Sequence, residues 1–134
     1  MSSGFKEIKH TADWALEVWA PDFCGLLKQA ALGMNWLMGV ELVKAERIDQ
    51  TIIITAADFE TLLVAFLNEI LFHMETESIG FNEFDIHLND FTLEARLQGA
   101  RLQGMKIAIK AVTYHNLEIK RTRDGLETTI VFDV

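Results

Sequence analysis

The last seven residues of the chain, 128–134, combine the pattern of a β-strand with two neighbouring carboxylates. Ile130 and Phe132 recur at every second position and predict a strand with one buried face. The side chain of Asp133 and the α-carboxylate of Val134 belong to adjacent residues. Two negative charges at ~4 Å repel by about 4 kcal/mol where the effective dielectric constant is near 20. We therefore expect a positive partner, such as a basic side chain, a helix N-terminus or a hard cation, unless the strand simply ends at the surface with Asp133 in water.

A third carboxylate stands near the beginning of the chain. Asp13 closes the segment H-T-A-D at 10–13, in the predicted turn between two short strands. Chain ends often lie close together in a domain, so pairing of a first strand with the last one would bring Asp13, Asp133 and the Val134 carboxylate together. Calcium and magnesium prefer such oxygen ligands. Three converging carboxylates would bind a divalent cation, and the alternative is an Asx turn in which Asp13 caps its own backbone.

The sequence offers few other catalytic signatures. It has no glycine-rich phosphate loop, no G-x-S-x-G motif, no paired cysteines and no H-E-x-x-H motif, and its four histidines include no i, i+4 pair. A hydrolase built on His10 and Asp13 would lack a nucleophile with an oriented base. Cys24 falls on the apolar face of a predicted helix and is expected to be a small core residue. Glu69, beside another helical stripe, is either exposed or a polar group that reaches into a site.

Two helices are predicted to position these groups, each opened by a capping aspartate. Asp22 precedes an apolar stripe at three- and four-residue spacing, and Gly39 ends it. Asp58 precedes a second stripe that runs to His73 or Met74. Around the first helix and before the second, the residue types predict extended segments at 5–10, 14–20 and 46–55.

The second half of the chain is predicted to consist mainly of strands. A loop at 76–80 is followed by predicted strands at 81–88, 92–97, 105–111, 113–120 and 127–134. Tyr114 and His115 are neighbours in one of these strands, so one is expected to face the core and the other the solvent. The pentapeptide A-R-L-Q-G occurs twice in succession, at 95–99 and 100–104. It matches no known repeat period and is interpreted as a lengthened or remodelled hairpin.

Together these elements predict an α+β fold, with two main helices packed on a mostly antiparallel β-sheet in a single two-layer domain, 1–134. The chain has 134 residues, half of them apolar, which is enough to form a core. No uninterrupted apolar run is long enough to span a bilayer. The first six residues lack the apolar region of a signal peptide, so a cytoplasmic location is expected.

The charge of the chain limits its partners. Twelve basic and twenty acidic residues give a net charge of −8. Such a surface repels phosphates, so tight direct binding of nucleic acid is not expected. The one basic cluster, 120–123, falls where a hairpin turn is predicted and is interpreted as solvated. An acidic surface favours a metal ion or a basic protein partner.

Four segments taken together resemble the archease family. They are H-T-A-D at 10–13, L-L-V-A-F-L-N-E at 62–69, I-K-A-V-T-Y-H at 109–115 and F-D-V at 132–134, and they run from end to end of the chain in the family's order. The resemblance implies a small accessory protein that is not itself an enzyme. It implies that the partner is an RtcB-type RNA ligase, which joins RNA ends in tRNA splicing, and that the protein promotes guanylylation and repeated turnover of that ligase.

By the same resemblance, the metal site falls on Asp13, Asp133 and the terminal carboxylate of Val134, with calcium as the ion. An acidic tip that carries the metal is then expected to dock at the active site of the ligase. The chain departs from the family pattern at Phe66, where Trp is common, at Trp14 and Ala15, where smaller or aliphatic residues are frequent, and around the duplicated pentapeptide. It does not depart at the three ligands.

The alternative hypothesis is a chaperone-like interaction module without a metal role. It would act through exposed apolar residues such as Trp14, Trp19 and Trp36, and its activity would survive chelation.

Overall fold

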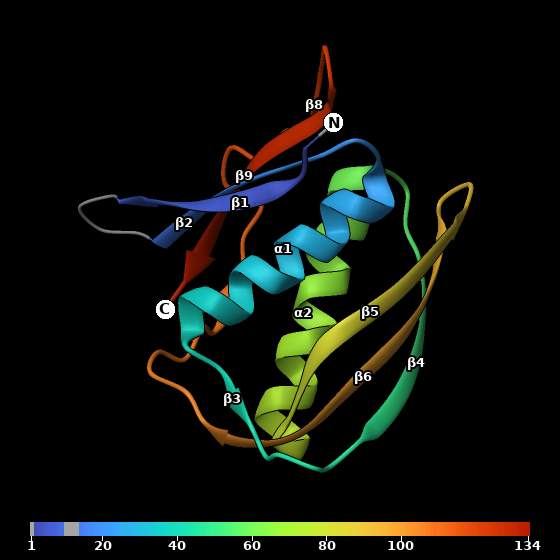
Figure 1. The fold of residues 1–134 in the computed structure, drawn as a ribbon. Coiled ribbons are helices and arrows are strands. Elements are labelled where there is room, and N and C mark those ends of the chain that lie inside the picture. The colour runs from blue at the N-terminus through green and yellow to red at the C-terminus, as the bar shows by residue number, and fades with distance from the viewer. Residues whose placement is uncertain (1, 10–13) are drawn as a thin grey trace.

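The computed structural model describes residues 2–9 and 14–134 (Figure 1). Residues 1 and 10–13, which include His10 and Asp13, lie outside the described residues. The helices are α1 (Phe23–Met38) and α2 (Phe59–Glu77). The strands are β1 (Gly4–Lys9), β2 (Trp14–Ala20), β3 (Glu41–Leu42), β4 (Ile48–Thr55), β5 (Ile79–Asn89), β6 (Thr92–Gly104), β7 (Ala111–Val112), β8 (Lys120–Thr122) and β9 (Gly125–Asp133).

Both helices begin at the predicted aspartates. The first turn of a helix has backbone N–H groups without a partner in the helix, and a carboxylate just before it can accept from one of them. Asp22 Oδ1 accepts from the backbone N–H of Gly25 at 2.8 Å. Asp58 Oδ1 accepts from the backbone N–H of Thr61 at 2.7 Å. These two local bonds fix where α1 and α2 start.

Both helices end in a residue with left-handed backbone. Gly39, with φ +64°, closes α1 as predicted. Ser78, with φ +55°, closes α2. The predicted end of α2 at 73–74 and the predicted loop at 76–80 are therefore wrong. His73 contacts Glu77 across one further turn, an i, i+4 pair that keeps this segment helical.

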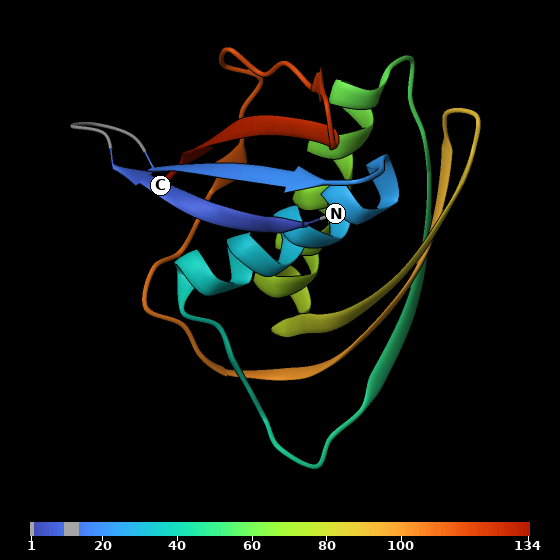
Figure 2. The ribbon, with the colours of Figure 1, turned by 45° about the horizontal axis from the view of Figure 1, so that its top comes forward.

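The strands form two antiparallel sheets, and the two helices lie between them (Figures 1 and 2). The first sheet has the order β1-β2-β9-β7, with β8 also paired to β9. In the second sheet the long strand β6 is central and pairs with β3, β4 and β5. The predicted α+β fold, with two helices packed on antiparallel strands, is confirmed. The strands are shared between two faces of the helical layer.

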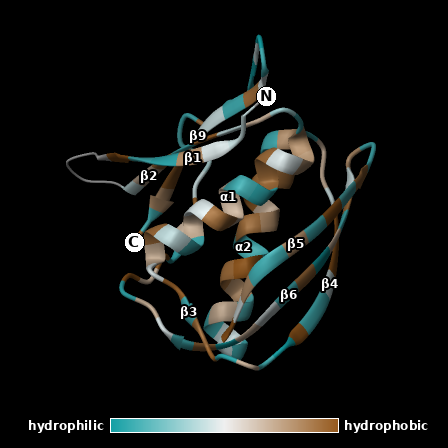
Figure 3. Ribbon diagram, viewed as in Figure 1, coloured by the Kyte–Doolittle hydropathy of each residue, from teal (hydrophilic) through white to brown (hydrophobic). Residues whose placement is uncertain are grey.

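The core forms where the apolar stripes of the helices meet the inward faces of both sheets. Leu16 and Val18 of β2 are buried, whereas Glu17 between them is partly exposed, as the two-residue period of a strand requires. Phe66 of α2 is buried and meets Phe84 of β5 edge-on, with ring centroids 6.4 Å apart. In Figure 3 both the helices and the strands of the second sheet carry hydrophobic and hydrophilic bands, as expected for elements with one buried face. Of the described residues, neither helix combines the length and apolarity that crossing a membrane requires.

Residues 105–119 are mostly irregular, so the predicted strands 105–111 and 113–120 are wrong. The backbone N–H groups of Lys106 and Ile107 donate to the carbonyl of Met38 at the end of α1, at 2.8 and 3.1 Å. These two N–H groups therefore bond to a carbonyl at the end of a helix, which has no partner within the helix, and not to a neighbouring strand.

The segment around Tyr114 and His115 is a turn. The N–H of Leu117 donates to the carbonyl of Tyr114 at 3.0 Å, and Asn116 adopts φ +52°. Both Tyr114 and His115 are exposed. The expectation that one of them faces the core is wrong, because a turn does not alternate its side chains as a strand does.

The duplicated pentapeptide lies within strand β6 and lengthens the β5–β6 hairpin. A repeat of odd length should reverse which side chains face inward. Gly99 and Ala100 are consecutive and both buried, so the alternation of buried and exposed residues shifts by one position between the two copies. Arg96 and Arg101, which occupy the same place in the two copies, are therefore both exposed. The register of β5 shifts opposite this point, as at a β-bulge.

The exposed Arg101 forms an ion pair with Glu46. The Arg101 guanidinium donates to Glu46 at 2.7 and 3.0 Å, and these bonds hold the pKa of Glu46 below its ordinary value.

Candidate functional site

The carboxyl end of β9 is held between two other strands. Trp14 of β2 pairs with Phe132 on one side, and Ala111 of β7 pairs with Asp133 on the other. The predicted alternation is confirmed, because Ile130 and Phe132 are buried while Val131 is partly exposed and Asp133 is exposed. The fold therefore presents the carboxylate of Asp133 from a strand that is paired on both sides.

Asp13 lies outside the described residues, but Trp14, which follows it, is described, and so is Lys9 before the segment. Strands β1 and β2 flank segment 10–13 and pair with each other up to Lys9 and Trp14. Trp14 pairs in turn with Phe132. Asp13 is bonded to Trp14, and Asp133 is bonded to Phe132. The last strand thus pairs with the second strand of the chain, β2, while the first strand, β1, pairs only with β2. The convergence of Asp13 on Asp133 stays a prediction.

The donor atoms at this end of β9 suit a hard cation. Asp133 offers carboxylate oxygens, which calcium prefers. In residues 2–9 and 14–134, no group of three or more His, Cys, Asp or Glu side chains could hold a metal ion. Asp133 also takes part in no salt bridge with the described residues, and Lys110 contributes only a backbone N–H to the carbonyl of Asp133, at 2.8 Å. The chemistry fits a cation, but further oxygens would have to come from another segment.

Asn68 of α2 fixes the strand beside Asp133, a role that sequence analysis did not predict. The N–H of Val112 donates to Asn68 Oδ1 at 2.9 Å, and Asn68 Nδ2 donates to the carbonyl of Val112 at 3.4 Å. One helix side chain thus satisfies both backbone groups of a residue in the two-residue strand β7. The only signal in the sequence is a polar residue beside an apolar helical stripe.

Glu69, for which two interpretations were open, faces another side chain of its own helix. Its Oε1 lies 3.5 Å from Nε2 of the buried His73, while Nδ1 of the same ring contacts Glu77. The imidazole is therefore flanked by carboxylates one turn before and one turn after it. The arrangement ties together the last turns of α2.

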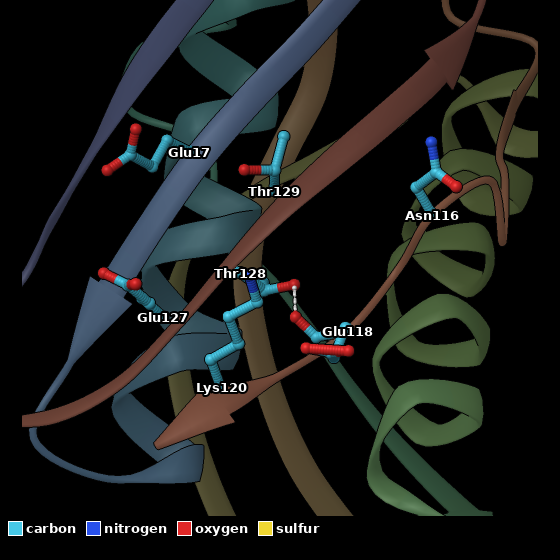
Figure 4. A pocket seen from close by; sticks show the side chains of 7 residues that line it. All are labelled: Glu17, Asn116, Glu118, Lys120, Glu127, Thr128 and Thr129. Atoms are coloured by element: carbon cyan, nitrogen blue, oxygen red, sulfur yellow. Dashed lines mark hydrogen bonds between the residues drawn. The ribbon is translucent and has the colours of Figure 1, made fainter. Parts of the chain in front are cut away.

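A hollow of about 250 Å³ lies along β2, β8, β9 and the loop before β8 (Figure 4). Its lining carries three carboxylates and one ammonium group, from Glu17, Glu118, Glu127 and Lys120. Thr128 closes one wall by donating to the carbonyl of Glu118 at 2.9 Å. In Figure 4 the three carboxylates are spread around the hollow and do not aim at one point. This spread does not suit a shared metal ion.

A more apolar groove of about 310 Å³ lies near Asp133. Its lining includes Met38, Met74, Met105 and also Lys110, whose backbone N–H donates to the carbonyl of Asp133. Methionine side chains are flexible and adapt to different apolar partners. The groove therefore offers an apolar contact surface close to the carboxylates of β9.

The three tryptophans differ in exposure. Trp36 is 59% exposed, whereas Trp14 and Trp19 are only partly exposed. The expectation that all three are exposed is wrong for the last two, because Trp14 packs against the core and Trp19 covers Gly4.

Cys24 is partly exposed and lies outside the core, although it was expected to be a core residue. Partial burial and the nearby Asp22 raise the pKa of its thiol, which disfavours the reactive thiolate.

Comparisons with known proteins show that the chain is similar to one protein family. Residues 5–134 match a family model described as the Archease protein family. An archease-like protein of Dictyostelium discoideum is 34% identical, covering 97% of this chain and 93% of that protein. An archease of Methanosarcina mazei is 27% identical over 97% of this chain and 95% of its own length. The crystal structure of an archease from Thermotoga maritima, described as a possible chaperone, matches with a TM-score of 0.74 at 24% identity and 96% coverage of both chains, a likeness of fold.

Proposed function

This chain belongs to the archease family, and on that basis we propose that it is a cytoplasmic accessory protein of an RtcB-type RNA ligase. In this proposal it is not an enzyme itself. It promotes guanylylation of the ligase and lets the ligase act repeatedly during tRNA splicing.

One observation of the structure supports this proposal above the others. The pairing of β2 with β9 runs to Trp14 and Phe132, the residues bonded to Asp13 and Asp133. Two aspartates from distant parts of the sequence are thus each attached to one of two paired residues. The proposed metal ligands are Asp13, Asp133 and the carboxylate of Val134, with calcium or another divalent cation as the ion.

The described residues have clear roles in such a site. Phe132, buried, anchors the strand that carries Asp133, and Asn68 holds β7 against the other edge of that strand. A bound cation would neutralise the carboxylates and could share oxygen ligands with a partner. The protein's contribution is then to hold its carboxylates on a fixed strand end, at an exposed position that a ligase could reach.

The net charge supports a protein partner. A protein that holds RNA needs a basic surface, and a chain with net charge −8 is attracted to such a surface while it repels RNA itself. No tight direct contact with nucleic acid is therefore part of the proposal.

The experiment compares an aspartate at the end of β9 with one in the turn before that strand. Asp133→Asn keeps the shape of the side chain and removes its charge, and Asp124→Asn makes the same change in the turn before the strand. Calcium affinity is measured by titration calorimetry, and guanylylation by label transfer from GTP to the purified ligase. We expect Asp133→Asn to weaken calcium binding on the order of 10–100-fold and to abolish stimulation, whereas Asp124→Asn behaves as wild type.

Two further variants extend the test. Asp13→Asn should match Asp133→Asn, and one residue added after Val134 should weaken calcium binding because it moves the free carboxylate. Unchanged unfolding midpoints would show that the fold is intact. Full stimulation by both aspartate variants would refute the proposal.

A chaperone-like interaction module is the second candidate. The methionine-lined groove and the exposed Trp36 favour it, because both are apolar surfaces open to a partner. Under this function, stimulation survives a calcium chelator and falls in a Trp36→Ser or Met105→Ser variant. Loss of stimulation on chelation, with both of these variants active, would exclude it.

A further inference from the structure

The phenylalanines of three Asp-Phe dipeptides, distant in the sequence, lie next to one another. The pairs are 22–23, 58–59 and 90–91, and their phenylalanine rings form a row. The centroids of Phe23 and Phe59 are 4.6 Å apart, and those of Phe59 and Phe91 are 4.9 Å apart. We call these six residues the Asp-Phe cluster. It joins the first turns of both helices to the turn between β5 and β6.

The outer end of this row is open to solvent. Phe23 is buried, but Phe59 is 37% exposed and Phe91 is 42% exposed. The backbone N–H of Ala56 donates to the carbonyl of Phe91 at 3.1 Å, which ties the hairpin turn to the segment just before α2. Two adjacent, partly exposed aromatic rings on a fixed backbone form an apolar contact surface, and aromatic side chains are common anchors of protein interfaces.

The sequence around each of the three phenylalanines is acidic. Within three residues on either side of each phenylalanine, the sequence has five acidic residues and no basic one. Asp22, Asp58 and Asp90 are all exposed. None of them takes part in a salt bridge with the residues that the structure describes.

The same three carboxylates are fixed by the fold. Asp22 and Asp58 each accept a backbone N–H as helix caps, and Asp90 occupies a left-handed turn position with φ +54°. The N–H of Thr61 holds the pKa of Asp58 below its ordinary value, so this carboxyl stays ionised well into the acid range. A partner would therefore meet charges that need little reorganisation on binding.

The Asp-Phe cluster is separate from the end of β9 that carries Asp133. Leu126, near the start of β9, pairs with Ala20, two residues before Asp22, whereas Asp133 ends the same strand. A strand of this length spans about 23 Å from Leu126 to Asp133. In Figure 1 the two helix N-termini and the β5–β6 turn lie toward the upper right, and the C-terminus lies at the left.

We propose that the Asp-Phe cluster is a docking surface for an arginine-bearing segment of a partner protein. The guanidinium group is planar, so it can stack on an aromatic ring while its edge donates to a carboxylate. The paired rings of Phe59 and Phe91 supply the stacking surface, and the three aspartates supply the acceptors. A lysine has a compact ammonium without this planar shape and fits the surface less well. The proposal holds whether or not the chain acts on a ligase through a metal.

The test is binding of the full chain to short peptides, followed by NMR and calorimetry. The probe is acetyl-Gly-Arg-Gly-Arg-Gly-Arg-Gly-amide, compared with the same peptide carrying lysine or glutamine in place of arginine. We expect saturable binding of the arginine peptide, with shifts concentrated at Phe59, Phe91 and their neighbours. The lysine peptide should bind roughly threefold more weakly, and the glutamine peptide should not bind.

Variants separate this surface from general attraction to an acidic protein. The triple change Asp22→Asn, Asp58→Asn and Asp90→Asn keeps the caps and the turn, because asparagine suits both. The control, Asp49→Asn with Glu75→Gln and Asp85→Asn, changes the net charge equally at exposed positions elsewhere. We expect the first triple to weaken arginine-peptide binding about tenfold and the second to weaken it much less.

Phe91→Ser tests the rings, with Phe72→Ser as its control because Phe72 is 54% exposed on α2 and lies outside the cluster. The first variant should reduce affinity about threefold and the second should leave it unchanged. Equal effects of the two aspartate triples, equal binding of the arginine and lysine peptides, or peptide shifts spread over the whole acidic surface would each overturn the proposal.

Discussion

Asn68 shows how much of the site depends on a single side chain. Strand β7 has only two residues and pairs with β9 at Asp133 and Phe132. Its Val112 gives its N–H and its carbonyl to Asn68 instead of to another strand. The strand beside Asp133 is therefore held by a side chain of α2. The position of the Asp133 carboxylate thus depends on Asn68, which is not one of the proposed metal ligands.

Replacing Asn68 by Ala should loosen this edge. Val112 would keep both backbone groups partly buried without partners, which costs about 1–3 kcal/mol of unfolding free energy. Urea denaturation measures that loss, and hydrogen exchange at the Val112 amide should become faster. Asn82→Ala, at an exposed position of β5, is the control and should change neither quantity. Unchanged exchange at Val112 in the Asn68 variant would contradict this account.

The residue scale also shows where prediction from sequence stops. The alternation of Ile130, Phe132 and Asp133 is local, so the exposure of Asp133 could be predicted. The role of Asn68 could not, because a polar residue beside an apolar stripe has the same spacing whether it meets water or a strand. That choice is made by the tertiary fold.

At the scale of elements, the two copies of the pentapeptide occupy different surroundings within β6. Gly99 of the first copy faces backbone, since a Cβ there would lie 1.8 Å from the carbonyl oxygen of Gly80. Gly104, at the same place in the second copy, has nothing within 4 Å of its added Cβ. The identical sequences thus carry opposite constraints, and the close approach at Gly99 is what lets β5 shift register.

The pair Gly99→Ala and Gly104→Ala tests this difference directly. Gly99→Ala should destabilise the protein by about 3 kcal/mol or more, because the clash is with backbone that cannot rotate away. Gly104→Ala should be neutral or stabilise by up to about 1 kcal/mol, through reduced freedom of the unfolded chain. Thermal and urea unfolding measure both. Similar stabilities of the two variants would show that the backbone at Gly99 relaxes.

The elements that could be predicted are those whose boundaries are set locally. Asp22 and Asp58 bond to N–H groups three residues away, so both helix starts follow from short-range chemistry. Residues 105–119 have an alternating apolar pattern, but their backbone completes the end of α1 at Met38. The sequence pattern cannot distinguish a strand from an irregular segment that packs apolar residues on a distant helix end.

At the scale of the whole molecule, the first sheet is built from distant parts of the chain. Trp14 and Phe132 are paired although more than a hundred residues separate them, whereas β5 and β6 are joined by a tight turn. Contacts between distant residues form late because closing a long loop costs more entropy. Pulse-labelled hydrogen exchange during refolding should therefore protect the β5–β6 amides before those of β2 and β9. Simultaneous protection of both sheets would contradict this order.

The pairing of β2 with β9 also has a consequence for the chain as it is made. The ribosome releases β1 and β2 first, and every other described strand must follow before β9 emerges. At usual rates of elongation, the edge of β2 that pairs with β9 then remains unpaired for roughly 5–20 s. During this interval the nascent chain exposes an unpaired strand edge, the feature that chaperones shield from aggregation. The pairing of β9, the strand that carries Asp133, with β2 therefore covers this exposed edge.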